Sequence, residues 1–286
     1  MTLFGQILAN GILLGGLYGL MALGMGLVWG VLNIVNLAHG AFIMLGGYAV
    51  YFLFTLAGID PFLALPIAMV GMFCFGYLLQ MFVLNFIVRS ALLNTLLITF
   101  GFDVVFVYLA QLLFTADFRT INPTYSGSSV DLAGVTIPYS TAGAFLVAIL
   151  LAGALYVFLD QTRTGRAIRA TAQNLTAARL YGVNPRRIYA LTFGVGAALA
   201  GAAGGLFGVV SQITPYIGIT LTAKSFVIAI LGGLDKPLGV IVGGLVLGIA
   251  EAMTDLYLGS TFKDIISFGL LVLILVARPA QLVGRA

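Results

Sequence analysis

Residues 160–187, DQTRTGRAIRATAQNLTAARLYGVNPRR, form the most basic segment of the chain. Six of the ten arginines lie within it, and no acidic residue follows Asp160 until Asp235. The flanking residues 139–159 and 188–210 are mostly apolar, and each stretch is long enough for a membrane-spanning helix, which takes roughly 20 residues. The basic segment therefore predicts a polar loop between two transmembrane helices.

The rest of the chain continues this pattern. Of its 286 residues, 61% are hydrophobic and 8% are charged, whereas a soluble protein has about 25% charged residues. The apolar runs are continuous, which favours helices over a β-barrel. They cover residues 3–29, 41–57, 62–88, 91–114, 139–159, 188–210, 226–234, 238–258 and 265–277. The run at 226–234 is long enough to span only if it extends back to Thr220, so we expect an all-α polytopic membrane protein with about eight transmembrane helices, within a range of seven to nine.

The basic residues also predict an orientation. By the positive-inside rule, the loop at residues 160–187 is cytoplasmic. Counting crossings from it places Arg89, Arg278 and Arg285 on the same side and the loop at residues 115–138 outside. The N-terminus then lies outside if the chain turns at the cytoplasmic side near His39. The outer loop is rich in Gly, Pro and Ser, which predicts turns and short extended pieces. We find no soluble domain, so residues 1–286 are expected to form one transmembrane domain.

Within the basic loop, the arginine spacing predicts a helix. Arg163, Arg166 and Arg169 recur at every third residue and so lie along one side of it. Thr162 or Thr164 can cap its first turn, because a threonine hydroxyl accepts a hydrogen bond from an amide left unpaired there.

A second short helix is predicted over residues 175–180. Gly182 follows at a position where a left-handed residue commonly ends a helix. Asn184 and Pro185 can cap and begin the next membrane helix. A loop with two capped helices suits docking to a rigid partner with an acidic rim. The simpler alternative is that the charge only fixes orientation and attracts anionic lipid.

Three stretches carry a recognisable pattern: GLVWGVLNIVNLAHGAFIMLGGY at residues 26–48, GRAIRATAQNLTAARLYGVNPRRIYALTFGVGAALAGAAGGLFG at 165–208, and TPYIGITLTAKSFVIAILGGLDKPLGVIVGGLVLGIAE at 214–251. The first contains an Asn-x-x-His-Gly motif at Asn36, His39 and Gly40. Together the stretches resemble the permeases of bacterial branched-chain amino acid ABC transporters, and specifically the H-type of the two paralogous permease subunits.

The resemblance implies a type II-like ABC importer membrane domain in the bacterial inner membrane, taking up branched-chain or related amino acids. The implied partners are a paralogous second permease, two cytoplasmic ATP-binding subunits and a periplasmic substrate-binding protein. ATP is expected on those subunits alone, because this chain has no GxxxxGK[ST] phosphate loop. With one His and one Cys, we expect no catalytic or metal site and no cofactor. The net charge of +4 comes largely from the basic loop and does not indicate a nucleic-acid partner. The residues expected to couple the chain to the ATPases are Arg163, Arg166, Arg169, Arg179, Gly182, Arg186 and Arg187.

Polar residues after the first apolar run suggest a site within the membrane. Asn33, Asn36 and His39 are spaced by three, which predicts one shared helical face, and each is costly in lipid. Gly30 and Gly40 permit a break in the helix here. Either these residues satisfy backbone groups at the break, with His39 as the partner of a carbonyl, or the break lines the translocation path.

Asn94 and Asp103 complete the candidate path residues. A buried carboxylate either pairs with a cation or takes up a proton, so Asp103 is also the one sequence feature that favours an ATP-independent secondary carrier. Within the family, urea or short amides are the alternative substrates. A scaffold that transports nothing is a third hypothesis.

The run LGGLDKPLGVIVGG at residues 231–244 interrupts an apolar stretch with Gly and Pro. It predicts a discontinuous helix, either as a tight helical hairpin or as a re-entrant gate. Lys224, Glu251, Lys263 and Asp264 fall near span ends, where their side chains are expected to reach toward the interface or to pair across helices.

Overall fold

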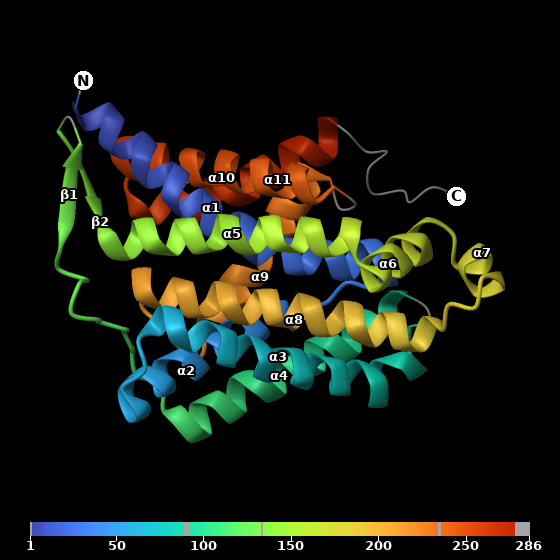
Figure 1. Cartoon of the computed structure of the whole chain (residues 1–286). Coiled ribbons are helices and arrows are strands. Elements are labelled where there is room, and N and C mark those ends of the chain that lie inside the picture. Colours follow the sequence, from blue (N-terminus) through green and yellow to red (C-terminus); the bar gives the residue numbers. More distant parts are fainter. Residues whose placement is uncertain (1, 89–91, 133, 234–235, 278–286) are drawn as a thin grey trace.

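The computed structural model describes residues 2–88, 92–132, 134–233 and 236–277 (Figure 1). Arg89, Asp235, Arg278 and Arg285, on which parts of the expected topology rest, lie outside the described residues. The helices are α1 Thr2–Leu32, α2 His39–Ala57, α3 Pro61–Phe82, α4 Leu92–Phe114, α5 Tyr139–Gln161, α6 Arg163–Gln173, α7 Leu175–Leu180, α8 Pro185–Val210, α9 Ile217–Gly232, α10 Pro237–Tyr257 and α11 Lys263–Ala277. Two short 3-10 helices, η1 Leu84–Phe86 and η2 Ser260–Phe262, and two strands, β1 Ser129–Leu132 and β2 Val135–Pro138, complete the described structure.

Seven helices in the described part of the chain are long and apolar enough to cross a membrane: α1 to α5, α8 and α10. α9 is a shorter apolar helix that begins at Ile217, so it absorbs Thr220 to Lys224 as the expected extension required. The predicted all-α polytopic membrane protein is confirmed.

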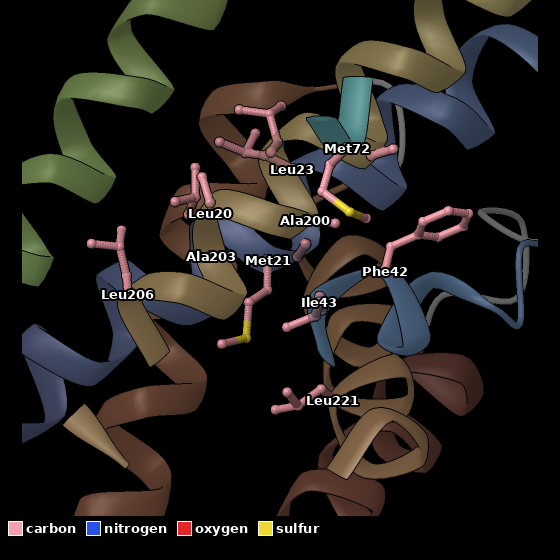
Figure 2. Close-up of a cluster of buried hydrophobic side chains, with 14 of the residues drawn as sticks. Leu20, Met21, Leu23, Phe42, Ile43, Met72, Ala200, Ala203, Leu206 and Leu221 are labelled. Atoms are coloured by element: carbon pink, nitrogen blue, oxygen red, sulfur yellow. The ribbon is translucent and has the colours of Figure 1, made fainter. Parts of the chain in front are cut away.

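The helices lie roughly side by side, with β1 and β2 at one end of the bundle and α6 and α7 at the other (Figure 1). We call these the hairpin end and the basic end. α1 and α8 are the most buried of the long apolar helices, and they contact each other. α1 also packs against α10, and α8 packs against α3. Figure 2 shows part of the core, where side chains from α1, α2, α3, α8 and α9 meet: Leu20, Met21, Leu23, Phe42, Ile43, Met72, Ala200, Ala203, Leu206 and Leu221.

Small residues allow α1 and α10 to approach closely. Gly11 faces Ile249 and Gly19 faces Ile241, so the two helices run antiparallel. A Cβ added at Gly15, between them, would lie 2.7 Å from the Cα of Leu245. Glycines four residues apart share a helix face, and in a membrane such faces let backbones pack at short range.

The helix signals in the basic loop are confirmed. Thr162, not Thr164, caps α6 by accepting a hydrogen bond from the Gly165 amide at 2.9 Å. α7 covers the predicted residues and is followed by Gly182 with φ of 81°. Asn184 caps α8, whose first residue is Pro185. The α7 cap, Asn174, was not anticipated, although it is a residue type that commonly caps helices.

The loop at residues 115–138 forms the expected short extended pieces. β1 and β2 pair as an antiparallel hairpin, with Val130 opposite Ile137. Gln6 of α1 joins the hairpin, because its side chain bonds both the amide and the carbonyl of Thr136. The hairpin is thereby tied to the start of α1.

The predicted helical face of Asn33, Asn36 and His39 is wrong. α1 ends at Leu32, Asn33 has a left-handed φ of 53°, and α2 begins only at His39. Since the intervening residues are not helical, a spacing of three does not align their side chains. The expected break in the helix is nevertheless present at this position.

The second glycine-rich interruption is a helical hairpin. α9 ends at Gly232 and α10 begins at Pro237. The two helices pack antiparallel, with Gly243 against Ile228. The expected discontinuous helix is therefore present, and whether this hairpin acts as a re-entrant gate stays a prediction.

Candidate functional site

The break between α1 and α2 is held by side chains from distant helices. The Leu37 amide donates to the Thr99 hydroxyl of α4 at 3.2 Å, and the Gly40 amide donates to the Thr222 hydroxyl of α9 at 2.8 Å. The Thr99 hydroxyl also lies 3.1 Å from the Val35 carbonyl oxygen. Backbone groups freed by a break at membrane depth must be satisfied internally, and these two threonines satisfy several of them.

His39 and Asn36 are buried at the break. Nε2 of His39 lies 2.9 Å from the Met21 carbonyl oxygen, and the residue is 1% exposed. A carbonyl only accepts hydrogen bonds, so Nε2 must carry the proton. His39 thus has the carbonyl partner that the structural alternative requires. The Oδ1 atom of Asn36 is buried and has no hydrogen-bond partner within the described residues.

The other candidate path residues differ in position and burial. Asn33 and Asn94 are exposed at the protein surface. Asp103 is buried on α4, one turn beyond Thr99 and on the same helix face, and its Oδ1 atom has no partner in the described part of the chain. The structure therefore places Asn33, Asn36 and His39 in the break, where Asn36 and His39 are buried and Asn33 is exposed.

A buried charged cluster forms a second candidate site. Nζ of Lys224 on α9 lies 2.8 Å from Oε1 of Glu251 on α10, and it lies 3.6 Å from Asp264 on α11. The Tyr18 hydroxyl donates to Oε2 of Glu251 at 2.8 Å, and the Ser267 hydroxyl donates to Oε1 at 2.6 Å. The cluster therefore joins α1, α9, α10 and α11.

Pairing across helices was expected for the charged members of this cluster, and it is present. Lys263 in addition pairs with Asp255 at 3.0 Å. The roles of Tyr18 and Ser267 were missed, because a tyrosine and a serine in apolar runs have no local signal that distinguishes them from ordinary packing residues.

A cavity of about 500 Å³ lies beside this cluster. Its polar lining includes Asn10, Tyr18, Lys224, Glu251 and Lys263, and its apolar lining includes Ile7, Leu14 and Val210. Pro138 and Thr141 also line it, which places the cavity toward the hairpin end of the bundle. The site thus combines both signs of charge with an apolar wall.

At the basic end, α6 and α7 protrude from the bundle (Figure 1). All the expected coupling residues are exposed: Arg163, Arg166, Arg169, Arg179, Gly182, Arg186 and Arg187. Arg169 forms an ion pair with Asp160 at 2.9 Å, and both side chains are about half exposed. Two large side chains at the tip, Leu180 and Tyr181, were not anticipated from the sequence, and they are 84% and 90% exposed.

Comparisons with known proteins agree with this architecture. Residues 7–275 match the family described as Branched-chain amino acid transport system / permease component. The chain is 33% identical to the high-affinity branched-chain amino acid transport system permease protein BraD of Pseudomonas aeruginosa, covering 98% of this chain and 95% of BraD. It is 34% identical to LivH of Escherichia coli, which carries the same description, covering 99% of this chain and 96% of LivH.

Two further similarities are more distant. LivM of Escherichia coli, also a high-affinity branched-chain amino acid transport system permease protein, is 30% identical over 93% of this chain and 67% of LivM. PsaBC from Streptococcus pneumoniae, solved in complex with Fab, aligns with a TM-score of 0.52 at 12% identity, covering 96% of this chain and 93% of that chain; at this identity the likeness concerns the fold alone. The full-length family match and the identity to BraD and LivH show that this chain belongs to the family of permease components of branched-chain amino acid transport systems.

Proposed function

We propose that this chain is the membrane-spanning permease subunit of an ATP-driven importer of branched-chain amino acids in a bacterial inner membrane. The names of BraD and LivH support the substrate class, and the similarity to both LivH and LivM supports assembly with a paralogous second permease. Two ATP-binding subunits dock at the basic end, and a periplasmic substrate-binding protein docks at the hairpin end. The orientation follows the positive-inside rule.

The single observation that carries the proposal is the construction of the basic end. α6 and α7 are each capped at the N-terminus, and their tip exposes Leu180 and Tyr181 beside Arg179. A large aromatic and an aliphatic side chain next to arginine are the residue types that anchor protein interfaces. A loop that served only for orientation or lipid contact needs the charge but not this exposed apolar tip.

The protrusion is also built to transmit motion. α6 contacts α1, α5 and α8, and its own residue Ile168 is buried. Gly165 packs closely against the backbone of Phe158 at the end of α5. Closure of the ATPases would therefore move α6 as a rigid element and bias the attached helices between two access states. In this mechanism the break near Asn36 and His39 lies on the translocation path and absorbs part of the movement.

Reconstitution of the complete transporter tests the proposal. The two permeases, the ATP-binding subunits and the substrate-binding protein are placed in proteoliposomes, and uptake of labelled leucine is measured with competing isoleucine, valine, urea and acetamide. We expect ATP-dependent uptake that isoleucine and valine inhibit. Uptake of labelled urea or acetamide in place of leucine would assign the other substrate class, and no uptake of any of the three would favour a scaffold.

A further inference from the structure

We propose that the cavity beside Lys224 and Glu251 is a transient binding site for the zwitterionic backbone of the amino acid as it passes through this subunit. The inference rests on the proposed function and narrows it to one place in the chain. The site recognises an α-ammonium and an α-carboxylate through the lysines and acids of the cluster, and a branched alkyl side chain through the apolar wall.

Two charged residues beside the cavity, Lys224 and Glu251, are buried. The side chains of Lys224 and Glu251 are only 11% and 6% exposed. Ionisable residues inside a membrane are costly, and they are retained mainly where they face a polar cavity or a substrate pathway. Here both groups line a cavity of about 500 Å³, within the range of roughly 300–1,000 Å³ typical of small-molecule sites.

The ion-paired residues at this site contain more carboxylates than lysines. Two lysines, Lys224 and Lys263, face three acids, Glu251, Asp255 and Asp264, so one carboxylate is in excess. Lys224 is shared between two of the acids, Glu251 and Asp264. An incoming ammonium group can therefore pair with a carboxylate without leaving a lysine unpaired.

The mouth of the cavity provides the complementary cation. Lys263 and Asp255 pair at 3.0 Å, and their side chains are 34% and 47% exposed. A zwitterion that lies against this pair places its ammonium on Asp255 and its carboxylate on Lys263. The two ion pairs then alternate in sign, so neither charge of the substrate is left uncompensated.

The apolar wall accounts for the side chain. Ile7, Leu14 and Val210 line the same cavity as the charged groups. Each buried CH₂ group changes affinity by roughly fourfold, so the site favours leucine over alanine. Tyr18 and Ser267 hold the Glu251 carboxylate in position from α1 and α11, which connects occupancy of the cavity to four helices.

A phosphatidylethanolamine headgroup also combines an ammonium with an acidic anion, so the experiment separates the two sources. The complete transporter is placed in nanodiscs of phosphatidylcholine and phosphatidylglycerol, which lack primary ammonium groups. Photo-leucine, a diazirine analogue of leucine, is cross-linked during ATP turnover, and the labelled peptides are identified by mass spectrometry. Leucine uptake by proteoliposomes of the same lipids is measured in parallel.

We expect photo-leucine to label α1 near Ile7 and Leu14 and α10 near Glu251. Leucine should compete with this labelling at least tenfold more strongly than isoamylamine, which lacks the carboxylate, or isocaproate, which lacks the ammonium group. Asp255→Asn and Lys263→Gln should each reduce labelling at least fivefold. The control Lys236→Gln, an exposed basic residue that does not line the cavity, should leave it unchanged.

Three results would overturn the inference. Labelling confined to other helices while ATP-driven uptake proceeds would contradict this site and leave the proposed function standing. If added phosphatidylethanolamine abolishes the labelling while leucine uptake is unchanged, the cavity is a lipid site. Equal competition by isoamylamine and leucine would exclude recognition of a zwitterion. Absence of ATP-driven uptake would instead contradict the proposed function.

Discussion

Nζ of Lys224 and Oε1 of Glu251 lie 2.8 Å apart between α9 and α10, with both side chains almost fully buried. Burying two charges is costly, and removing one partner leaves the other uncompensated. Lys224→Met should therefore lower the free energy of unfolding by about 3–5 kcal/mol. The double variant Lys224→Met, Glu251→Gln should recover more than half of that loss, because no buried charge is left unpaired and the remaining Asp264 carboxylate is 59% exposed to solvent. Denaturant unfolding in detergent measures both, and a single variant as stable as the wild type would contradict the pairing.

The close approach of α1 and α10 predicts a steric effect at Gly15. Gly15→Ala places a Cβ 2.7 Å from the Cα of Leu245, so one helix must shift. Overpacking of this kind costs about 1–3 kcal/mol, which thermal unfolding can detect. Gly101→Ala on α4 is the matched control, since no atom lies within 4 Å of its added Cβ. Equal stability of the two variants would show that the helices are not in such close contact.

The break between α1 and α2 predicts a requirement for a hydroxyl at residue 222. Thr222→Val keeps the shape of the side chain but leaves the Gly40 amide without its acceptor. An unsatisfied buried donor costs about 1–3 kcal/mol, so the melting temperature should fall. Thr222→Ser retains the hydroxyl and should stay closer to the wild type. If valine and serine had the same effect, the hydrogen bond would not be what holds the break.

The exposed arginines of the basic end predict an effect on association with the ATP-binding subunits that is separate from any effect on folding. Arg166→Glu combined with Arg179→Glu should leave expression and thermal unfolding unchanged, because both side chains are exposed. Reversal of charge against an acidic rim should reduce co-purification of the ATP-binding subunits at least tenfold. Lys236→Gln, an exposed basic residue outside α6 and α7, is the control. Recovery of the ATPases at wild-type yield with the double variant would contradict docking at this surface.

The features predicted correctly from the sequence depend on local signals. Thr162, Gly182 and Asn184 act within their own helix turn, so the boundaries of α6, α7 and α8 could be predicted from the residues alone. The long apolar runs likewise predicted the membrane helices, because lipid leaves few other ways to satisfy the backbone.

The features that were missed depend on distant contacts. Asn33 adopts a left-handed backbone, and the segment after it is held partly by Thr99, which lies 62 positions from Leu37 in the chain. The hydrogen bond from Tyr18 to Glu251 joins residues 233 positions apart. No periodicity within α1 indicates either contact, so the wrong helical face at Asn36 and the unanticipated role of Tyr18 have the same origin.

The central claim is that this chain works as part of an ATP-driven importer. Measuring leucine uptake with different energy sources tests this claim most directly. Proteoliposomes are prepared with this chain alone and with the complete set of permeases, ATP-binding subunits and substrate-binding protein, and each is supplied with ATP or with a proton gradient. We expect uptake only from the complete set, only with ATP, and only when the substrate-binding protein is present. Uptake by this chain alone, driven by the proton gradient and abolished by Asp103→Asn, would contradict the account and identify a secondary carrier.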